Sequence, residues 1–489
     1  MLKHLIFILS FFWGALARAH SFDERYDLPI PLEFFLVGGG AVVAATFLMI
    51  VIAVKSWPTS WHISGSSVLV FGERMSATIL FLGQLVSITL LFLVIAAGFW
   101  GPGNPLLNLA PNFIWITWWL GTSLFIALFG NIWPIINPWS ALYDLLAWIG
   151  QRLGLQLKTP SPMLVFPNYL GLFWVTACLL AWSWMEVVYP IAFVPAKVAS
   201  IGLIWTLLSL IGVYLFGRDV WLKRGDVFSV YFEMLGQFGI FYFQTSDRSL
   251  RIRMPGAGIL LNANYWRNTP GVMAFIIAML AIVLFDGLHG SEGWGYFISL
   301  VQHLGLSRIS SSSYAMGTIG LLLVWLVFMG LFYGSCWISS CYANVSVGQL
   351  SHFFATALIP IAVAYLIAHN FSSLMIQGQS IIFLMSDPLG LGWDIFSTAN
   401  FRPNIGVIDA KFTWYMAVFA IVVGHIIALV LNHLLAMRLV GSSQKATWVT
   451  LPQAVLMIMF TMLSLVIIAE PMTTSEFNPI EICFSNDAS

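Results

Sequence analysis

The sequence predicts an all-α membrane protein, a polytopic bundle of about ten transmembrane helices. Hydrophobic residues make up 60% of its 489 positions and charged residues only 8%, whereas about a quarter of the residues in a soluble domain are charged. Apolar runs long enough to cross about 30 Å of hydrocarbon recur along the whole chain. No low-complexity tract or soluble domain interrupts them. A lipid bilayer is therefore the expected surroundings of the protein.

The first 19 residues have the pattern of a secretory signal peptide. A basic start at Lys3 precedes an apolar run over residues 5–16, and Ala17-Arg18-Ala19 fits the small-residue cleavage pattern. Cleavage there makes His20 the first residue of a single transmembrane domain, residues 20–489. The alternative is a retained first helix, which leaves the remaining topology unchanged.

Ten apolar runs are long enough to span a membrane. They occupy residues 32–54, 79–100, 113–133, 166–188, 197–217, 271–288, 314–335, 352–370, 412–436 and 452–470. With the mature N-terminus outside, thirteen Lys and Arg residues fall on the cytoplasmic side and five outside. The thirteen are Lys55, Arg74, Arg152, Lys158, Arg218, Lys223, Arg224, Arg248, Arg251, Arg253, Arg267, Arg438 and Lys445, and the five are Arg25, Lys197, Arg308, Arg402 and Lys411. This bias predicts that both termini are extracytoplasmic.

Four segments between the spans are too short or too polar to cross. Residues 136–152 and 226–243 are amphipathic and rich in aromatic rings, so we expect helices at the cytoplasmic interface. Residues 245–268 carry concentrated positive charge, which is typical of a loop facing anionic headgroups. Residues 371–385 and the glycine-rich turn after them predict a re-entrant or surface hairpin on the outer side.

Ionisable side chains gather at the outer ends of the predicted spans. The set consists of Glu33, Glu186, Asp286, His369 and Glu470 on the spans, Asp387 and Asp394 in the hairpin, and His20 after cleavage. Carboxylates and imidazoles on one face are what a divalent metal site or an acid–base pair requires. His20, His369, Asp387, Asp394 and Asp286 are therefore candidate ligands of zinc or copper.

A structural interpretation competes with this functional one. Helix ends are where polar groups cost least, so Glu33, Glu186 and Glu470 are equally well explained as interfacial carboxylates without function. Apolar helix or turn glycines flank His369, Asp286 and Asp387, and for these three we favour a functional role. His289 and His303 lie in a loop and are expected to be ordinary surface histidines.

His425 and His433 stand on the ninth predicted span. Eight residues separate them, which places them about 12 Å apart along the helix, too far to share one metal. For His425, near the middle of the span, a proton relay, a haem ligand and a packing role remain open. His433 is expected to be structural.

Several function classes are excluded. The net charge is zero, so no positive field attracts nucleic acid. The four cysteines, Cys178, Cys336, Cys341 and Cys483, form no CxxC pair or zinc knuckle. The sequence also lacks HExxH, GxSxG, a Walker loop and CxxCH. Any chemistry must combine residues from several helices.

Six stretches together resemble a bacterial family of multi-pass membrane proteins known as fenitrothion hydrolases. They are AHSFDERYDLPIPLEFF at 19–35, FDG at 285–287, IPIAVAYLIAHNF at 359–371, IQGQ at 376–379, SDPLGLGWDIF at 386–396 and GHIIALVLNH at 424–433. The resemblance spans nearly the whole chain. It implies hydrolysis of the P–O-aryl bond of a lipophilic phosphotriester and carries over no catalytic residue.

Three functional hypotheses follow. In the first, an outer site activates water against a lipophilic ester, with His369 and Asp387 as metal ligand or general base and Asp286 as the second carboxylate. In the second, the outer residues capture a metal or solute that a transporter moves past His425. In the third, the chain is an accessory subunit with no chemistry of its own and a fixed protein partner.

Overall fold

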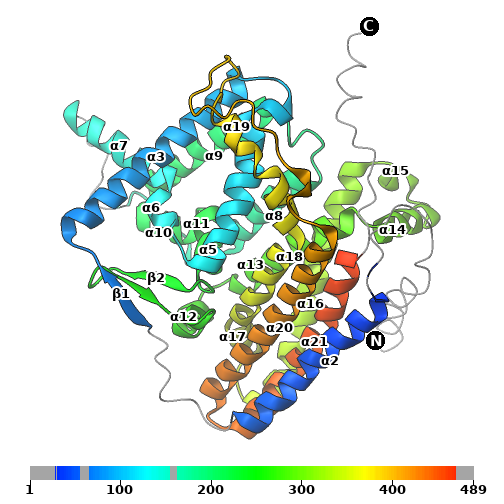
Figure 1. Ribbon diagram of the computed structural model, residues 1–489. Coiled ribbons are helices and arrows are strands. Elements are labelled where there is room, and N and C mark those ends of the chain that lie inside the picture. The colour runs from blue at the N-terminus through cyan, green and yellow to red at the C-terminus, as the bar shows by residue number, and fades with distance from the viewer. Residues whose placement is uncertain (1–27, 29, 55–64, 155–161, 470–489) are drawn as a thin grey trace.

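A computed structural model of the chain describes residues 28, 30–54, 65–154 and 162–469, and it is a bundle of helices (Figure 1). Within these residues, nine helical segments are long and apolar enough to cross a membrane. They are α2 (Leu32–Ala53), α3 (Glu73–Trp100), α4 with η2 and α5 (Leu109–Phe129), α9 (Pro195–Phe216), α13 (Val272–His289), α16 (Ser313–Ala343), α17 with η4 and α18 (Val347–Gln377), α20 (Ala410–Val440) and α21 (Ser443–Ala469). These helices confirm the predicted fold class and coincide with nine of the predicted spans.

The remaining predicted span, residues 166–188, is shorter than expected. Its helix α8 (Phe173–Val187) has 15 residues, about 22 Å, because the chain before it forms the 3₁₀ turn η3 (Asn168–Leu170). The other short elements are η1 (Pro105–Leu107), α6 (Trp133–Ile136), α7 (Pro138–Arg152), α10 (Arg218–Arg224), α11 (Val227–Gly236), α12 (Ala257–Arg267), α14 (Glu292–His303), α15 (Ser307–Ser310), α19 (Ser380–Leu384) and η5 (Ile405–Val407). The signal segment 1–19 lies outside the described residues.

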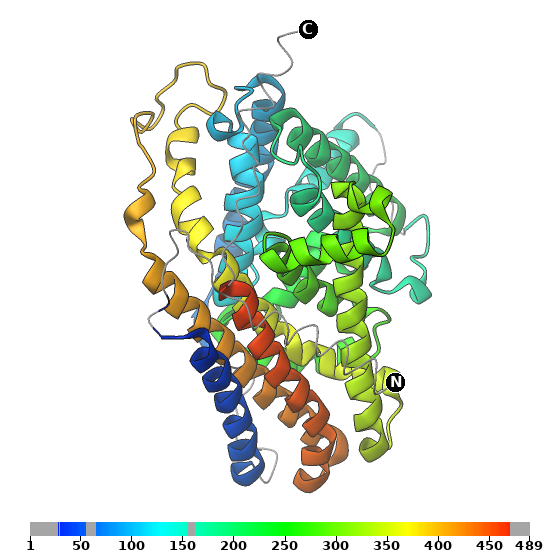
Figure 2. The ribbon, with the colours of Figure 1, turned by 90° about the vertical axis from the view of Figure 1, so that its right-hand side faces the viewer.

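Two helices form the centre of the bundle. In α13 every residue from Val272 to Phe285 is buried, and most of α17–α18 is buried as well. Helices α2, α20 and α21 lie side by side against this centre in both ribbon views (Figures 1 and 2). Gly424 allows α20 to approach α18 closely, since a methyl group at this position would lie 2.8 Å from the Pro360 carbonyl oxygen of α18. Because α13 and α18 are largely buried, packing fixes the positions of the side chains that they carry.

A small antiparallel sheet joins two segments that the sequence indicated only as loops. Strand β3 (Ser249–Ile252) pairs with β2 (Phe241–Gln244) on one side and with β1 (Ser66–Val70) on the other. Residues 245–268 therefore form part of a sheet and helix α12 rather than a loop. The sheet lies at one side of the bundle beside α12 (Figure 1).

Segments expected on one side of the membrane contact one another. Arg218 and Asp144, both expected to be cytoplasmic, form an ion pair. On the other side, the Asn112 side chain donates to the Gln377 carbonyl oxygen across 3.2 Å. These contacts agree with the predicted alternation of the spans across the membrane. Which side of the bundle faces the cytoplasm remains a prediction from the charge bias.

Residues 226–243 do not form the predicted interfacial helix. Helix α11 is enclosed by the protein along nearly its whole length, and residues 241–244 form strand β2. The reason is its aromatic content: Phe228 and Phe232 pack against tryptophans of other helices instead of anchoring at headgroups. Residues 138–152 are helical as expected.

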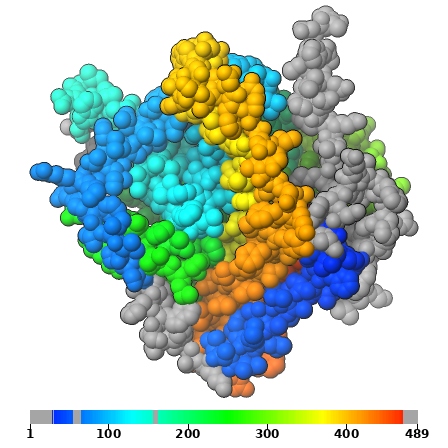
Figure 3. Space-filling model, in the orientation of Figure 1, coloured from blue at the N-terminus to red at the C-terminus, as the bar shows by residue number. Residues whose placement is uncertain are grey.

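The predicted hairpin extends helix α18. The helix continues through Gln377, α19 follows, and a mostly irregular chain over 385–409 leads back to α20. In the space-filling view this yellow-orange segment forms the top of the displayed face (Figure 3). Most of its residues are exposed, which corresponds to the surface form of the predicted hairpin.

Candidate functional site

Two of the predicted site residues meet where the last turn of α13 lies beside the middle of α18. His369 of α18 and Asp286 of α13, 83 positions apart in the sequence, lie with Nε2 2.8 Å from Oδ2. The histidine side chain is 8% exposed and the aspartate side chain 41% exposed. Since a carboxylate can only accept, Nε2 donates, and in the neutral ring Nδ1 then carries the lone pair. This arrangement orients an imidazole as a base.

The ring of His369 has defined neighbours. The Tyr365 ring, one helical turn earlier, stacks on it at 6.4 Å with an interplanar angle of 26°. The Tyr365 hydroxyl is buried and has no hydrogen-bond partner in the described part of the chain. Beside the histidine lies Gly287, where an added methyl group would be 3.7 Å from Nδ1. The absence of a side chain at 287 leaves Nδ1 space on that side.

A second carboxylate, Glu186, lies close to this pair. Its Oε2 accepts the indole N–H of Trp119 across 3.1 Å, and its carboxyl group is near enough to Asp286 for the two to interact. Glu186 is half-buried near the end of α8. Trp119 therefore holds Glu186 within the protein.

Asp387 and Asp394 are bound within the hairpin instead of joining His369. The two carboxylate oxygens of Asp387 accept the backbone N–H groups of Leu391 and Gly392 at 2.9 and 2.8 Å. Asp394 accepts the Ala399 backbone N–H and the Ser386 hydroxyl, and these bonds lower its pKa. Both residues thus hold the turn together.

The other candidate residues are dispersed. Glu33 is exposed at the start of α2, and His289 packs against Phe285 and Trp294. His20 and Glu470 lie outside the described residues. Among the residues that the structure does describe, no three His, Cys, Asp or Glu side chains form a cluster that could hold a metal.

Helix α20 carries a row of buried polar side chains with unmet hydrogen-bonding capacity. His425 donates from Nδ1 to the Ile421 carbonyl oxygen at 2.8 Å, and its Nε2 is buried with no hydrogen-bond partner among the residues that the structure describes. The same holds for Nε2 of His433, whose Nδ1 lies 3.3 Å from the Thr450 hydroxyl. Both amide atoms of Asn432 are buried without a partner as well. Such groups cost free energy unless something binds them.

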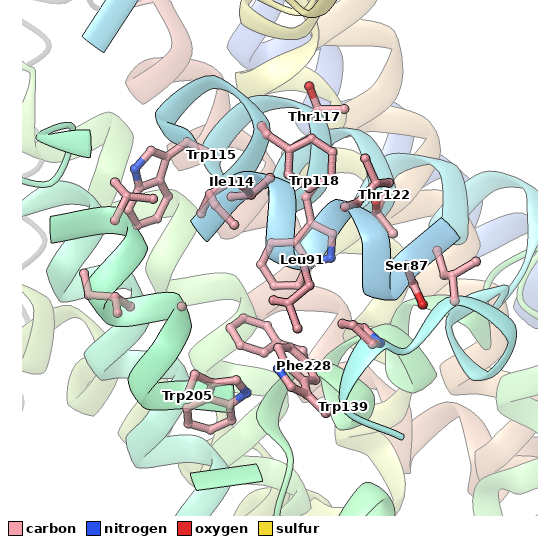
Figure 4. A pocket seen from close by; sticks show the side chains of 18 of the residues that line it. Ser87, Leu91, Ile114, Trp115, Thr117, Trp118, Thr122, Trp139, Trp205 and Phe228 are labelled. Carbon is pink, nitrogen blue, oxygen red and sulfur yellow. The ribbon is translucent and has the colours of Figure 1, made fainter. Parts of the chain in front are cut away.

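A cavity of about 300 Å³ lies between α3, η2, α6, α7, α8, α9 and α11 (Figure 4). Six tryptophans line it: Trp115, Trp118, Trp133, Trp139, Trp182 and Trp205. Helix η2 (Asn112–Thr122) is a π-helix of 11 residues, a rare form that is frequent at functional sites. Trp182 in its wall stands one helical turn before Glu186 on α8.

The sequence did not point to this cavity. Its tryptophans come from five separate elements, and aromatic rings near predicted helix ends are also typical of membrane anchoring. The one local signal is the run Ile116-Thr117-Trp118-Trp119, in which neighbouring indoles project from different sides of a helix.

The chain matches no protein-family model, and no curated protein or solved structure is significantly similar to it.

Proposed function

We propose that this protein is a hydrolase of the bacterial inner membrane, with both termini extracytoplasmic, that cleaves lipophilic aryl phosphotriesters. His369 acts as the general base and Asp286 orients it. The observation that carries the proposal is the 2.8 Å contact between these two side chains, which arise from distant parts of the sequence. The resemblance of the sequence to fenitrothion hydrolases supports the choice of substrate.

The chemistry needs one water molecule per turnover. Nδ1 of His369 removes a proton from water as the oxygen attacks phosphorus, the P–O-aryl bond breaks, and the aryloxide leaves. The imidazolium then returns its proton to the leaving group or to solvent. Asp286 stabilises the imidazolium that forms in between, because its carboxylate accepts a hydrogen bond from Nε2–H.

A bound zinc or copper ion would polarise the phosphoryl oxygen and lower the pKa of water. His369 and Asp286 supply two donors of the required type, and His20, the third candidate, lies outside the described residues. Turnover after chelation, and after addition of Zn²⁺ or Cu²⁺, separates metal-assisted catalysis from base catalysis by His369 alone.

The test is release of 4-nitrophenolate from diethyl 4-nitrophenyl phosphate by detergent-purified protein. His369→Gln and Asp286→Asn are each expected to lower kcat about 10²-fold or more, the usual contribution of a general base. His303→Gln is the matched control, since His303 is exposed on α14. Turnover unchanged in a folded His369→Gln protein would overturn the proposal.

The same assay decides the role of Asp387. Because its carboxylate only accepts hairpin amides, Asp387→Asn is expected to retain turnover while loosening the turn. A loss equal to that of His369→Gln would instead restore Asp387 to the catalytic group.

A second candidate function is transport of a metal or solute, favoured by the unpartnered polar atoms on α20. Nε2 of His425 and the Asn432 amide are seven residues apart on one face of the helix, about 10 Å along its axis. Zn²⁺ uptake into proteoliposomes, followed with an enclosed indicator, is expected to fall in His425→Phe if this candidate is right. The rate of phosphotriester hydrolysis is expected to be unchanged by the same substitution.

A further inference from the structure

The tryptophan-lined cavity has walls without charge. Among the described residues that line it there is no Asp, Glu, Lys, Arg or His, and the hydroxyl of Ser87 already donates to the Gln84 carbonyl oxygen at 2.9 Å. Figure 4 shows Trp118 reaching from η2 toward Trp139, Trp205 and Phe228 on the opposite wall. A charged occupant would lose its hydration here without gaining a partner.

Most indole N–H groups of the wall are already used inside the protein. Trp115 donates to the Ala192 carbonyl oxygen, Trp133 to Ser229, Trp139 to Thr206 and Trp205 to Asp226, at 3.0 to 3.3 Å. These four rings therefore offer an occupant their faces and C–H edges. Faces and edges of aromatic rings attract further aromatic rings in edge-to-face or offset arrangements.

The wall already has that geometry. The Trp118 ring meets the rings of Trp139, Trp182 and Phe228 nearly at right angles, with centroids 4.7 to 6.4 Å apart. Another ring placed among them would extend the same pattern. The volume of about 300 Å³ is about twice that of a cavity known to hold benzene, so it suits two rings.

We propose that this cavity is a binding site for an uncharged molecule with two aromatic rings. The inference deepens the proposed function, since it would make the aryl group the part of the substrate that this protein recognises. Two observations link the cavity to Glu186, the carboxylate close to Asp286. Trp182 of the cavity wall lies one turn from Glu186, and Trp119 of the π-helix donates to that carboxylate.

Photolabelling with benzophenone tests this binding without any turnover. The light-excited ketone abstracts hydrogen from a nearby C–H bond and the two carbons join, so peptide mapping by mass spectrometry locates the probe. We expect adducts on η2 and on the α9 residues of the wall. Naphthalene is expected to compete with the probe, and hexadecane at equal concentration is not.

Gly202 provides a direct way to fill the cavity. It lies on α9 in the wall, and a Cβ atom there would meet nothing within 4 Å, so Gly202→Phe can occupy the space without displacing backbone. Labelling is expected to fall about tenfold or more, the affinity that burial of a ring supplies. Gly330→Phe on exposed α16, where a Cβ atom also meets nothing, is the matched control. Trp118→Ala provides a second variant with the same expected loss.

Labelling spread over lipid-facing residues, or equal competition by hexadecane, would overturn the inference in favour of bulk lipid or an acyl chain. Labelling unaffected by a folded Gly202→Phe protein would overturn it too. His369→Gln is expected to label normally, so a failure of catalysis at His369 and a failure of binding in the cavity give different results.

Discussion

Trp119 donates its indole N–H to Glu186 across 3.1 Å, and this bond joins the π-helix η2 to the end of α8. The same indole stacks on Tyr231 of α11, with ring centroids 4.8 Å apart. The side chain of Trp119 therefore connects three elements, η2, α8 and α11. Its removal should affect both stability and function.

Trp119→Phe preserves an aromatic ring and removes the donor. We expect it to lower the free energy of unfolding by about 1–3 kcal/mol, because the half-buried Glu186 carboxylate loses its partner. The measurement is thermal unfolding in detergent, with Trp337→Phe, a residue 59% exposed, as control. Equal shifts in the two variants would show that the bond contributes nothing.

The hairpin is expected to open in acid. Hydrogen bonds from the Ala399 amide and the Ser386 hydroxyl lower the pKa of Asp394 in the folded protein. A carboxyl group with a lowered pKa stabilises the folded state above its unfolded pKa of about 4 and loses this contribution as the pH falls through the folded value. Hydrogen exchange of the Ala399 amide should therefore accelerate below pH 4, after correction for intrinsic rates.

Asp394→Asn serves as the control for that experiment. Without the ionising group, exchange at Ala399 should be fast at every pH and show no acid transition. A transition that persists in Asp394→Asn would assign the effect to another carboxyl group.

Buried polar residues on α20 and α21 should respond to substitution in opposite ways. Asn432→Leu removes two unpartnered amide atoms and is expected to leave stability unchanged or raise it by about 1 kcal/mol. Gln453→Leu removes a side chain that donates to Ser339 at 2.9 Å and should destabilise by about 1–3 kcal/mol. Thermal unfolding of both variants is the measurement. Strong destabilisation by Asn432→Leu would mean that its amide is satisfied by a bound water or ligand.

Gly424 should be intolerant of even a methyl group. An alanine there would overlap the Ala364 methyl group and approach the Pro360 carbonyl oxygen to 2.8 Å, so we expect Gly424→Ala to destabilise by about 1–3 kcal/mol. Gly330→Ala, with open space around the added Cβ atom, should be neutral or stabilising, since alanine favours a helix. Similar unfolding temperatures for the two variants would contradict this account of the crossing between α18 and α20.

The sequence predicted the parts of the fold that depend on local hydropathy. A run of about 20 apolar residues has few alternatives to a membrane span, and alternation of spans placed His369 and Asp286 at the same side, where they do meet. Residues 66–70, in contrast, carry no long strand pattern, and their pairing with 249–252 depends on a partner far along the chain. No local property of five residues identifies that partner.

The roles of aromatic and acidic side chains were harder to predict because each has two common uses. An aromatic ring in a membrane protein anchors at headgroups or packs inside, and Phe228 packs inside. An aspartate before Pro and Gly residues binds metal or caps its own turn, and Asp387 caps its turn. Which use applies depends on tertiary neighbours that a single sequence does not reveal.

The small sheet sets an order for biogenesis. Strand β1 leaves the ribosome about 180 residues before β3, its hydrogen-bonding partner. At 5–20 residues per second, translation of the intervening chain takes roughly 9 to 36 s. Helices α3, α5, α8 and α9 are synthesised in that time. The sheet can therefore form only after most of the first half of the protein has been synthesised, when β3 becomes available to pair with β1.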